Sequence, residues 1–325
     1  MIPYIDMHCD TLMKGYLSKA ENIICQPDFM VDINRLRVGG SRAQVFAIFM
    51  LKDETIRQLG DAYPGDRAYI EALLQLYRRT IQVSDHVAEM TSLADYERNL
   101  SAGKISGILS LEDGRPVDGV PENLDWLYGE GIRMIALTWN HENCFGYPNS
   151  TNPEVMQKGL KDFGIEAVKR MNELGILVDV SHLSDGGFWD VVRVSEKPFV
   201  ASHSNCRALS PHSRNMTDEM IRALADKGGV MGLNFYGAFL NADGAGQESR
   251  IERMILHLQH IVNVGGIETA AIGTDFDGIS GTLEIGDCGQ MARLFEAMER
   301  TGFTIGQIEK IAHQNVERVL KDVLK

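Results

Sequence analysis

The stretch ILVDVSH, residues 176–182, is a short apolar, β-branched run that ends in a histidine, and PFVASHS, residues 198–204, repeats the pattern. Short apolar runs of this kind are typical of strands buried in a parallel sheet. Comparable runs recur along the chain, and together they predict strands at Tyr4–Met7, Ala43–Met50, Ser106–Leu111, Met134–Thr138, Ile176–Val180, Phe199–Ala201, Val230–Asn234 and Ala270–Gly273. About eight strands is the number that closes a (β/α)8 barrel.

Amphipathic segments lie between most of these runs. Apolar side chains at helical spacing predict helices at Arg67–Val83, Leu160–Leu174, Thr217–Leu224, Ser249–Val264 and Gln290–Met298. Strand–helix alternation indicates an α/β protein with a parallel sheet, and about eight units favour a closed (β/α)8 TIM-type barrel over an open sheet. No linker marks a boundary, so we expect one catalytic domain over residues 1–325, with additions at Leu12–Leu36 and a C-terminal helical extension at Thr304–Lys325.

Composition and charge narrow the classes of function. The 325 residues are 44% hydrophobic and 24% charged, which is typical of a globular protein, and the net charge of −13 argues against a nucleic-acid partner. No apolar run is long enough to span a bilayer, and the first residues lack a basic segment followed by an apolar one. The five cysteines are odd in number and form no CxxC pair. We therefore expect a cytoplasmic protein with free thiols and no membrane partner.

Histidines and acids follow the predicted strands at positions scattered over most of the chain. The parallel strands of a barrel end on one rim, which carries the active site in enzymes of this fold. Imidazole nitrogens and carboxylate oxygens gathered on that rim are suited to zinc, iron or manganese. The residues that share this placement are His8, Asp10, Glu112, His182, His203 and Asp275.

The spacing of these residues suggests how they divide. In His8-x-Asp10, alternation along a strand points both side chains to one side and that of Cys9 to the other. A surface histidine beside an Asp10 that caps the next segment is the simpler interpretation of this pair alone. With two strand-end histidines, and with Glu112 shared between two ions, a metal site becomes the favoured interpretation. Two ions a few Å apart can hold and deprotonate a water.

Two further side chains are candidates for substrate chemistry. Asp275, in AAIGTDFDG, could exchange a proton with the reacting groups, although Asp277-Gly278 beside it is typical of a turn. Arg214 could bind a substrate carboxylate through two hydrogen bonds. Arg207 and His212 in the same loop compete for that role.

These motifs, taken in order, resemble the membrane (renal) dipeptidases and their soluble bacterial relatives, the M19 metallopeptidases, from Tyr4 to the helix near Asn315–Leu320. The resemblance implies a barrel with two zinc ions, with other divalent ions as an alternative. By this resemblance His8 and Asp10 hold one ion, Glu112 bridges and contributes to catalysis, and His182 and His203 hold the other. It also implies that Asp275 is the acid/base, that Arg214 binds the C-terminal carboxylate of the substrate, and that Asn234 and Tyr236 line the pocket.

Two departures from the family pattern accompany the resemblance. Many members carry a histidine after the fourth strand, in LTH, where this chain has Trp139, and the nearest imidazole is His141. Either His141 replaces that histidine from the loop or its role is absent, and Trp139 could instead form an apolar wall of the substrate site. The secretion signal and the membrane anchor of the membrane dipeptidases are not apparent either, which favours a soluble bacterial-type member.

The sequence therefore predicts a zinc-dependent dipeptidase that uses a metal-bridged hydroxide on L,L- and also L,D-dipeptides, with a homodimer as a further expectation from the resemblance. The first alternative is an amidohydrolase-type enzyme that acts on an N-acyl amino acid or a cyclic amide. Such enzymes usually show HxH after the first strand, where this chain has Asp10 as the second residue. The second alternative is a barrel that binds metal or peptide without catalysis.

Overall fold

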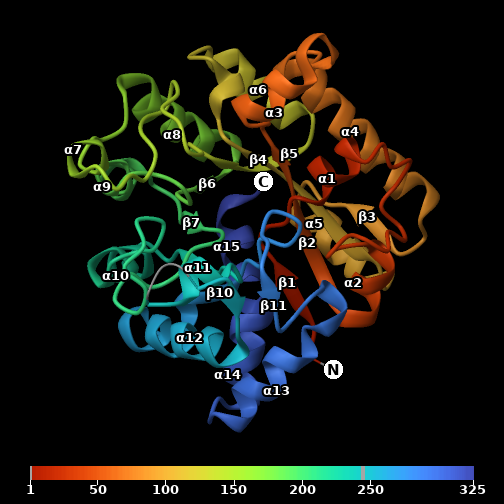
Figure 1. The fold of residues 1–325 in the computed structure, drawn as a ribbon, viewed down its shortest axis with the longest axis vertical. Coiled ribbons are helices and arrows are strands. Elements are labelled where there is room, and N and C mark those ends of the chain that lie inside the picture. The colour runs from red at the N-terminus through yellow and green to blue at the C-terminus, as the bar shows by residue number, and fades with distance from the viewer. Residues whose placement is uncertain (1, 243–245) are drawn as a thin grey trace.

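The computed structural model describes residues 2–242 and 246–325, and within these ranges eight parallel strands close a barrel that helices surround (Figure 1). The strands follow one another around the barrel in sequence order, and the last pairs with the first. The α/β fold class and the (β/α)8 barrel predicted from the sequence are confirmed. The barrel strands are β1 (Tyr4–Asp6), β2 (Ser41–Phe49), β4 (Ile105–Glu112), β5 (Ile132–Ala136), β6 (Leu177–Asp179), β7 (Val200–Ala201), β8 (Val230–Leu233) and β10 (Ala270–Ile272).

Three short strands lie outside the predicted set. β3 (Val87–Glu89) pairs with the first residues of β4, whereas β5 pairs with the later residues of β4. β9 (Glu248–Ser249) and β11 (Thr282–Leu283) form a separate two-stranded sheet. Their sequences, Val-Ala-Glu, Glu-Ser and Thr-Leu, contain no apolar run of the kind that marks the barrel strands, which explains why the sequence did not predict them.

The five predicted helices are present with shifted ends, as α4, α8, α10, α12 and α13. Local chemistry sets several of these ends. The hydroxyl of Thr217 accepts a hydrogen bond from the backbone N–H of Met220 and so caps α10, while Gly175 ends α8 in the left-handed conformation. Among the described residues the α-helices are α1 (Thr11–Leu17), α2 (Ile33–Gly39), α3 (Asp53–Leu59), α4 (Asp66–Val83), α5 (Leu93–Ser101), α6 (Pro121–Gly129), α7 (Pro153–Met156), α8 (Asp162–Leu174), α9 (Asp185–Val194), α10 (Asp218–Asp226), α11 (Gly237–Leu240), α12 (Ile251–Gly265), α13 (Ala292–Arg300), α14 (Ile305–Glu309) and α15 (Asn315–Val323).

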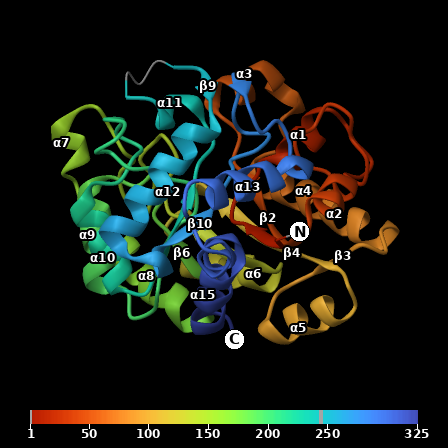
Figure 2. The ribbon, with the colours of Figure 1, turned by 90° about the horizontal axis from the view of Figure 1, so that it is seen from below.

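The apolar core divides into two clusters of buried side chains. The larger one joins the outer faces of the strands to the surrounding helices. The smaller one takes at least one side chain from each barrel strand and joins them to α15, which lies against the strands when the molecule is seen from below (Figure 2). A π-helical turn (Lys310–Gln314) connects α14 to α15. The C-terminal segment therefore packs on the barrel interior and leaves the opposite rim open.

The helices of the structure were compared with the length and apolar composition of a membrane-spanning helix. Among the residues that the structure describes, no helix combines the length and the apolar composition needed to cross a membrane.

Candidate metal centre

The six predicted rim residues lie at or just beyond the C-terminal ends of their strands. Glu112 is the last residue of β4, and the other five follow β1, β6, β7 and β10 within four residues. The parallel barrel therefore brings together side chains that are up to 267 residues apart in sequence, as in the contact of His8 with Asp275. His8, Asp10, Glu112 and His203 are buried, and the side chain of His182 is 10% exposed.

Three groups of ligand atoms lie close enough together to hold a metal ion: two of them share Glu112, and the third consists of His8, His203 and Asp275. In one group Nε2 of His8 lies 3.2 Å from Oε2 of Glu112 and 3.8 Å from Oδ2 of Asp10. In the other, Oε1 of Glu112 lies 3.1 Å from Nε2 of His182 and 3.6 Å from Nε2 of His203. Each group offers three donor atoms, all within 4.8 Å of one another. Two cations could be held in this way, with Glu112 between them.

The proton positions favour a cation between the two histidines. The single hydrogen of the Ser202 hydroxyl is donated to Asp179, so this hydroxyl accepts from Nδ1 of His203, at 2.7 Å. Nδ1 of His182 likewise donates to the Asn140 side-chain oxygen, at 3.1 Å. Both Nε2 atoms then carry lone pairs, although they lie 3.1 Å apart. Two lone pairs this close repel unless a metal ion accepts them, which is the usual role of a neutral imidazole at such a site.

Three buried atoms in the first group also form no hydrogen bond among the described residues. They are Oδ1 of Asp10 and the pair Nε2 of His8 and Oε2 of Glu112, which face each other at 3.2 Å without a hydrogen bond. Buried polar atoms without partners are costly in free energy, so native proteins rarely leave them unsatisfied. Asp10 is the N-cap residue of α1, but its side chain makes no capping hydrogen bond. The donor set therefore fits a divalent cation.

Burial and nearby negative charges shift the pKa values of Glu112 and Asp275 upward. Burial raises the pKa of Glu112 to about 8, and the negative charges of Asp10 and Asp275 add to this against the opposing effect of His8. Burial also raises the pKa of Asp275 to about 6, again against the charge of His8. A bound divalent ion would supply the positive charge that these carboxylates need.

The histidines divide into two kinds by charge. Burial lowers the pKa of His8, but the carboxylates of Glu112 and Asp10 outweigh burial and raise it well above its ordinary value. The pKa values of His182 and His203 are both lowered well below the ordinary value, chiefly by burial. These two imidazoles are therefore neutral, which is the form that binds a metal.

Asp275 and Asp277 have different surroundings. Asp275 has a left-handed backbone with φ of 62°, accepts a hydrogen bond from the Asn234 amide at 2.8 Å, and directs Oδ1 toward Nε2 of His8 at 3.8 Å. Asp277 points away from the site and accepts from the Thr11 hydroxyl, the Lys14 ammonium and two backbone N–H groups. Asp277 therefore connects the loop after β10 to α1 and to the segment that follows it, whereas Asp275 faces the ligand cluster.

A cavity of about 380 Å³ opens on the cluster, and two of the five predicted substrate residues line it. Trp139 and Tyr236 line it, and the Trp139 ring centroid lies 6.1 Å from that of His182. His141 is exposed and is not part of the lining. The lining consists of Asp10, Met13, Phe49, Lys52, Glu112, Trp139, Asn140, His182, Tyr236, Phe239, Asp275, Gly278, Ile279 and Ser280.

Arg214 lies behind this lining. It is buried, and its guanidinium donates to the Ser204 hydroxyl and to the backbone oxygen of His203, while Nε has no partner among the described residues. The guanidinium carbon lies 5.4 Å from the centroid of the Phe239 ring, which belongs to the lining. The two competitors in this loop are engaged elsewhere: Arg207 forms two hydrogen bonds with Asp185, and His212 accepts from the backbone N–H of Arg214.

Several residues of the site were not predicted from the sequence. Phe49, Lys52 and Met13 line the cavity, while Asn140 and the Asp179–Ser202 pair orient the histidines. Asn140 and Lys52 each follow a predicted strand, as the metal-binding candidates do, so position after a strand is the signal that could have identified them. Cys9 points away from the cluster as expected, with its thiol donating to the Val45 backbone oxygen.

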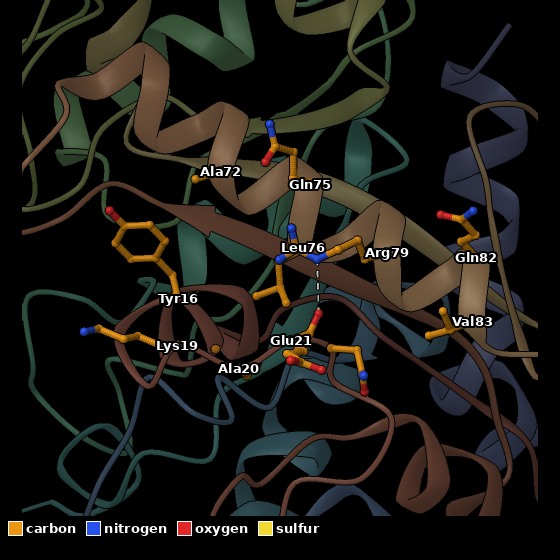
Figure 3. A pocket seen from close by; sticks show the side chains of 12 residues that line it. Tyr16, Lys19, Ala20, Glu21, Ala72, Gln75, Leu76, Arg79, Gln82 and Val83 are labelled. Carbon is orange, nitrogen blue, oxygen red and sulfur yellow. Dashed lines mark hydrogen bonds between the residues drawn. The ribbon is translucent and has the colours of Figure 1, made fainter.

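A larger cavity, of about 760 Å³, lies away from this cluster between α4 and the segment that follows α1 (Figure 3). Its lining includes Tyr16, Gln75 and Arg79, and Arg79 donates a hydrogen bond to the backbone oxygen of Glu21. It contains none of the grouped metal-binding candidates. The size of a cavity therefore does not identify the reactive site in this molecule.

Known proteins resemble this chain over most of its length. A protein of Klebsiella pneumoniae is 36% identical over 241 residues, which are 71% of this chain and 87% of that protein. Dipeptidase aclJ of Aspergillus oryzae is 29% identical over 297 residues, which are 90% of this chain and 70% of that protein. A metallopeptidase of Rhodobacter sphaeroides, solved with a phosphinate mimic of the dipeptide L-Ala-D-Ala, is 26% identical, covers 99% of both chains and has a TM-score of 0.88.

The family comparison agrees with the geometry of the site. The family model described as membrane dipeptidase, peptidase family M19, matches residues 1–325. Membership implies a metal cofactor and a small peptide substrate, and it argues against a barrel without catalysis. Because the match spans the whole sequence, this chain belongs to the membrane dipeptidase family, M19, and is a metallodipeptidase.

Proposed function

We propose that this protein hydrolyses L,L- and L,D-dipeptides with two zinc ions held by His8, Asp10, Glu112, His182 and His203. The observation that carries the proposal is the pair of ligand groups that share Glu112, with lone pairs and partnerless atoms directed at one another. Nitrogen and oxygen donors of this kind suit zinc, although manganese or iron would also be accepted. Two bound ions would act as Lewis acids and lower the pKa of a water to near neutrality.

Asp275 is the proposed general base and acid. The Asn234 amide holds one of its oxygens, so the other remains directed toward the cluster. A carboxylate fixed in this way can take a proton from the attacking water and return it to the departing amine. The raised pKa of Asp275, about 6, favours such an exchange near neutral pH.

Arg214 is the proposed partner of the substrate's C-terminal carboxylate. Its Nε lacks a protein partner among the described residues, so this buried donor is available to a ligand. A guanidinium offers two parallel N–H donors to a carboxylate, which favours short substrates with a free C-terminus at a fixed distance from the cluster. Trp139 is the proposed apolar wall of the site, because it lines the cavity and the exposed His141 does not.

The stereochemical part of the proposal rests on a structural relative. The metallopeptidase of Rhodobacter sphaeroides binds a mimic of L-Ala-D-Ala, and its fold matches this chain closely. We therefore include dipeptides with a D-residue at the C-terminus among the substrates. A cytoplasmic location, which the five free thiols would suit, and a homodimer stay predictions.

The test is hydrolysis of L,L- and L,D-dipeptides by purified protein as prepared, after chelation and dialysis, and after zinc is restored. We expect activity to disappear on metal removal and to return with about two zinc ions per chain. C-terminal amides of the same dipeptides should be resisted, because they cannot pair with Arg214. Zinc-loaded protein that cleaves N-acyl amino acids but no dipeptide would contradict the proposal and favour the amidohydrolase alternative.

A further inference from the structure

One wall of the rim cavity combines two aromatic rings with a lysine. Phe49 ends β2 and lies in register with Glu112 on β4, and Lys52 follows three residues later. Trp139 follows β5 and meets Phe49 edge to face, with ring centroids 5.1 Å apart. Nζ of Lys52 lies 5.4 Å from the centroid of the Trp139 ring. The three side chains therefore form one surface beside the cluster.

Lys52 is an unpaired cation on this surface. It is the one lysine or arginine among the fourteen residues that line the cavity. No carboxylate within residues 2–242 and 246–325 forms an ion pair with it. The acidic residues of the lining, Asp10, Glu112 and Asp275, converge instead on the ligand cluster. A negative group brought by a ligand would meet Lys52 without competition from the protein.

The order of the barrel strands determines which part of a dipeptide reaches this wall. Arg214 contacts Ser204 and His203, so it lies beside the end of β7. The Lys52 wall lies beside the ends of β2 and β5, which flank β4 and its Glu112. A dipeptide with its carboxylate at Arg214 and its peptide carbonyl at the cluster extends its N-terminal residue toward β2 and β5.

We propose that Lys52 is a specificity residue that selects dipeptides with an acidic side chain on the N-terminal residue. This inference rests on the proposed function, because it needs the substrate orientation that Arg214 sets. The methylene groups of a glutamate side chain would pack on Phe49 and Trp139, and its carboxylate would pair with the Lys52 ammonium. An aspartate side chain is one methylene shorter and would make less of the apolar contact.

The alternative role for Lys52 is to cover the Trp139 ring by a cation–π contact without touching substrate. That role predicts no discrimination between substrates of equal shape and different charge. L-Glu-L-Ala and L-Gln-L-Ala are such a pair, because the side chains differ by one charge and have nearly the same volume. The ratio of their kcat/KM values therefore separates the two roles.

The experiment measures this ratio in the zinc-loaded wild type, in Lys52→Met and in Lys52→Glu. We expect the wild type to prefer the glutamate substrate roughly two- to fivefold, as befits an ion pair near the surface, and added salt to reduce the preference. Lys52→Met should bring the ratio close to one. Lys52→Glu should favour L-Lys-L-Ala over L-Gln-L-Ala.

A matched control is Lys158→Met. Lys158 also lies over an aromatic ring, that of Tyr147 at 4.4 Å, and is not part of the cavity lining. This variant should keep the wild-type ratio. If Lys52→Met keeps that ratio too while dipeptides are still cleaved, the inference about Lys52 is overturned and the proposed function stands. If no dipeptide is cleaved by any zinc-loaded form, the proposed function itself fails.

Discussion

Two buried aspartates hold matching positions in different parts of the barrel rim. Asp6, at the end of β1, accepts hydrogen bonds from the backbone N–H and the hydroxyl of Thr274, which follows β10, at 2.9 and 2.7 Å. Asp179, at the end of β6, accepts from the backbone N–H and the hydroxyl of Ser202, which follows β7. In both places one carboxylate fastens the ends of two strands together.

The two hydroxyl groups differ in what else they contact. The Thr274 hydroxyl lies 3.4 Å from the backbone oxygen of His8 and accepts from the backbone N–H of Phe276. The Ser202 hydroxyl accepts instead from Nδ1 in the ring of His203. The hydrogen bonds of Asp6 therefore orient main chain. Those of Asp179, acting through the Ser202 hydroxyl, fix the orientation and the tautomer of the His203 ring. A buried aspartate at a strand end can thus contribute to stability alone, or it can also fix the proton position on a metal-binding histidine.

The charges of the two regions follow the same division. The β1–β10 region carries Asp10, Asp275 and a His8 whose pKa is raised by its carboxylate neighbours against the effect of burial. The β6–β7 region carries His182 and His203, whose pKa values burial holds well below the ordinary value. We infer that the first region supplies the ligands His8 and Asp10 together with proton transfer by Asp275, and that the second supplies two neutral imidazole ligands. Replacements in the two regions should therefore fail in different ways.

The largest effect is expected for Asp275→Asn in the β1–β10 region. An amide cannot accept and return a proton, so kcat should fall by about 10²- to 10⁴-fold. Asp275 is not needed by either ligand group that shares Glu112, so zinc content should remain at the wild-type level. Steady-state kinetics and metal analysis of the same preparation test both statements. Loss of zinc in parallel with activity would contradict the division of roles.

A smaller effect is expected for Ser202→Ala in the β6–β7 region. Without the hydroxyl, His203 loses the partner that fixes its proton on Nδ1, and partners of this kind typically change metal affinity by about 10- to 100-fold. Competition with a fluorescent zinc chelator would measure this affinity. Activity should return when excess zinc is added, because the acid/base group is intact.

Thr274→Ala is the matched control in the other region. Removal of this hydroxyl takes one donor from the buried Asp6 carboxylate, which should cost about 1–3 kcal/mol of stability. Zinc affinity should stay within about twofold of the wild type, since the Thr274 hydroxyl contacts the Asp6 carboxylate and main-chain atoms and no imidazole ring within the described part of the chain. Equal losses of zinc affinity in Ser202→Ala and Thr274→Ala would show that Asp179 and Asp6 have the same role.

The barrel and its rim could be predicted because parallel strands impose a simple rule. Every strand of the barrel ends on one rim, so residues such as His8 and His203 converge whatever lies between them in sequence. The rule concerns position after a strand and needs no knowledge of the loops. It failed to identify Lys52 and Asn140, which occupy such positions but carry residue types that are common on any exposed loop.

Other parts of the site depend on tertiary contacts that leave no local pattern. Asp179 lies inside ILVDVSH, where a single acid in an apolar run does not reveal which strand it will meet. Arg214 is recognisable as a cation in a loop, but its burial behind Phe239 follows from the packing of two separate loops. The strand β3 reads Val-Ala-Glu and has no apolar run, so its pairing with β4 is a consequence of the fold and not of its own pattern.

A histidine outside the metal centre should make the rim sensitive to moderate acid. His257 on α12 accepts from the backbone N–H of Cys206 and lies 3.1 Å from the Leu240 backbone oxygen, to which its other nitrogen donates. Burial lowers the pKa of His257 from 6.5 to about 4. The unfolded chain then binds the proton more readily, so stability is complete above pH 6.5 and is lost as pH falls toward 4. The loss should be about 1 kcal/mol at pH 5.5.

Denaturant unfolding of metal-free protein between pH 7.5 and 5.5 measures this loss. His257→Gln removes the titrating group, so its stability should change less over the same range, by about the same 1 kcal/mol. Identical pH dependence in the two proteins would show that His257 is not held neutral. Because the metal ligands are unchanged in this variant, their titration cancels in the comparison.

The smallest effect on stability is expected for Glu317→Gln, at the end of the barrel opposite the rim. Glu317 on α15 makes contact with His313, Tyr96 and Arg42; burial alone would raise its pKa, but these contacts lower it to about 2 from 4.5. A carboxylate with a depressed pKa stabilises the fold above pH 4.5, and that contribution is lost as pH falls toward 2. Since the group is partly exposed, solvent limits its contribution to less than about 1 kcal/mol. Glu317→Gln should therefore lower stability slightly at pH 6 and flatten the loss of stability as pH falls from 4.5 toward 2, while kcat at neutral pH stays unchanged. A change in kcat in this variant would mean that the bottom of the barrel is coupled to the rim, against the separation of roles argued above.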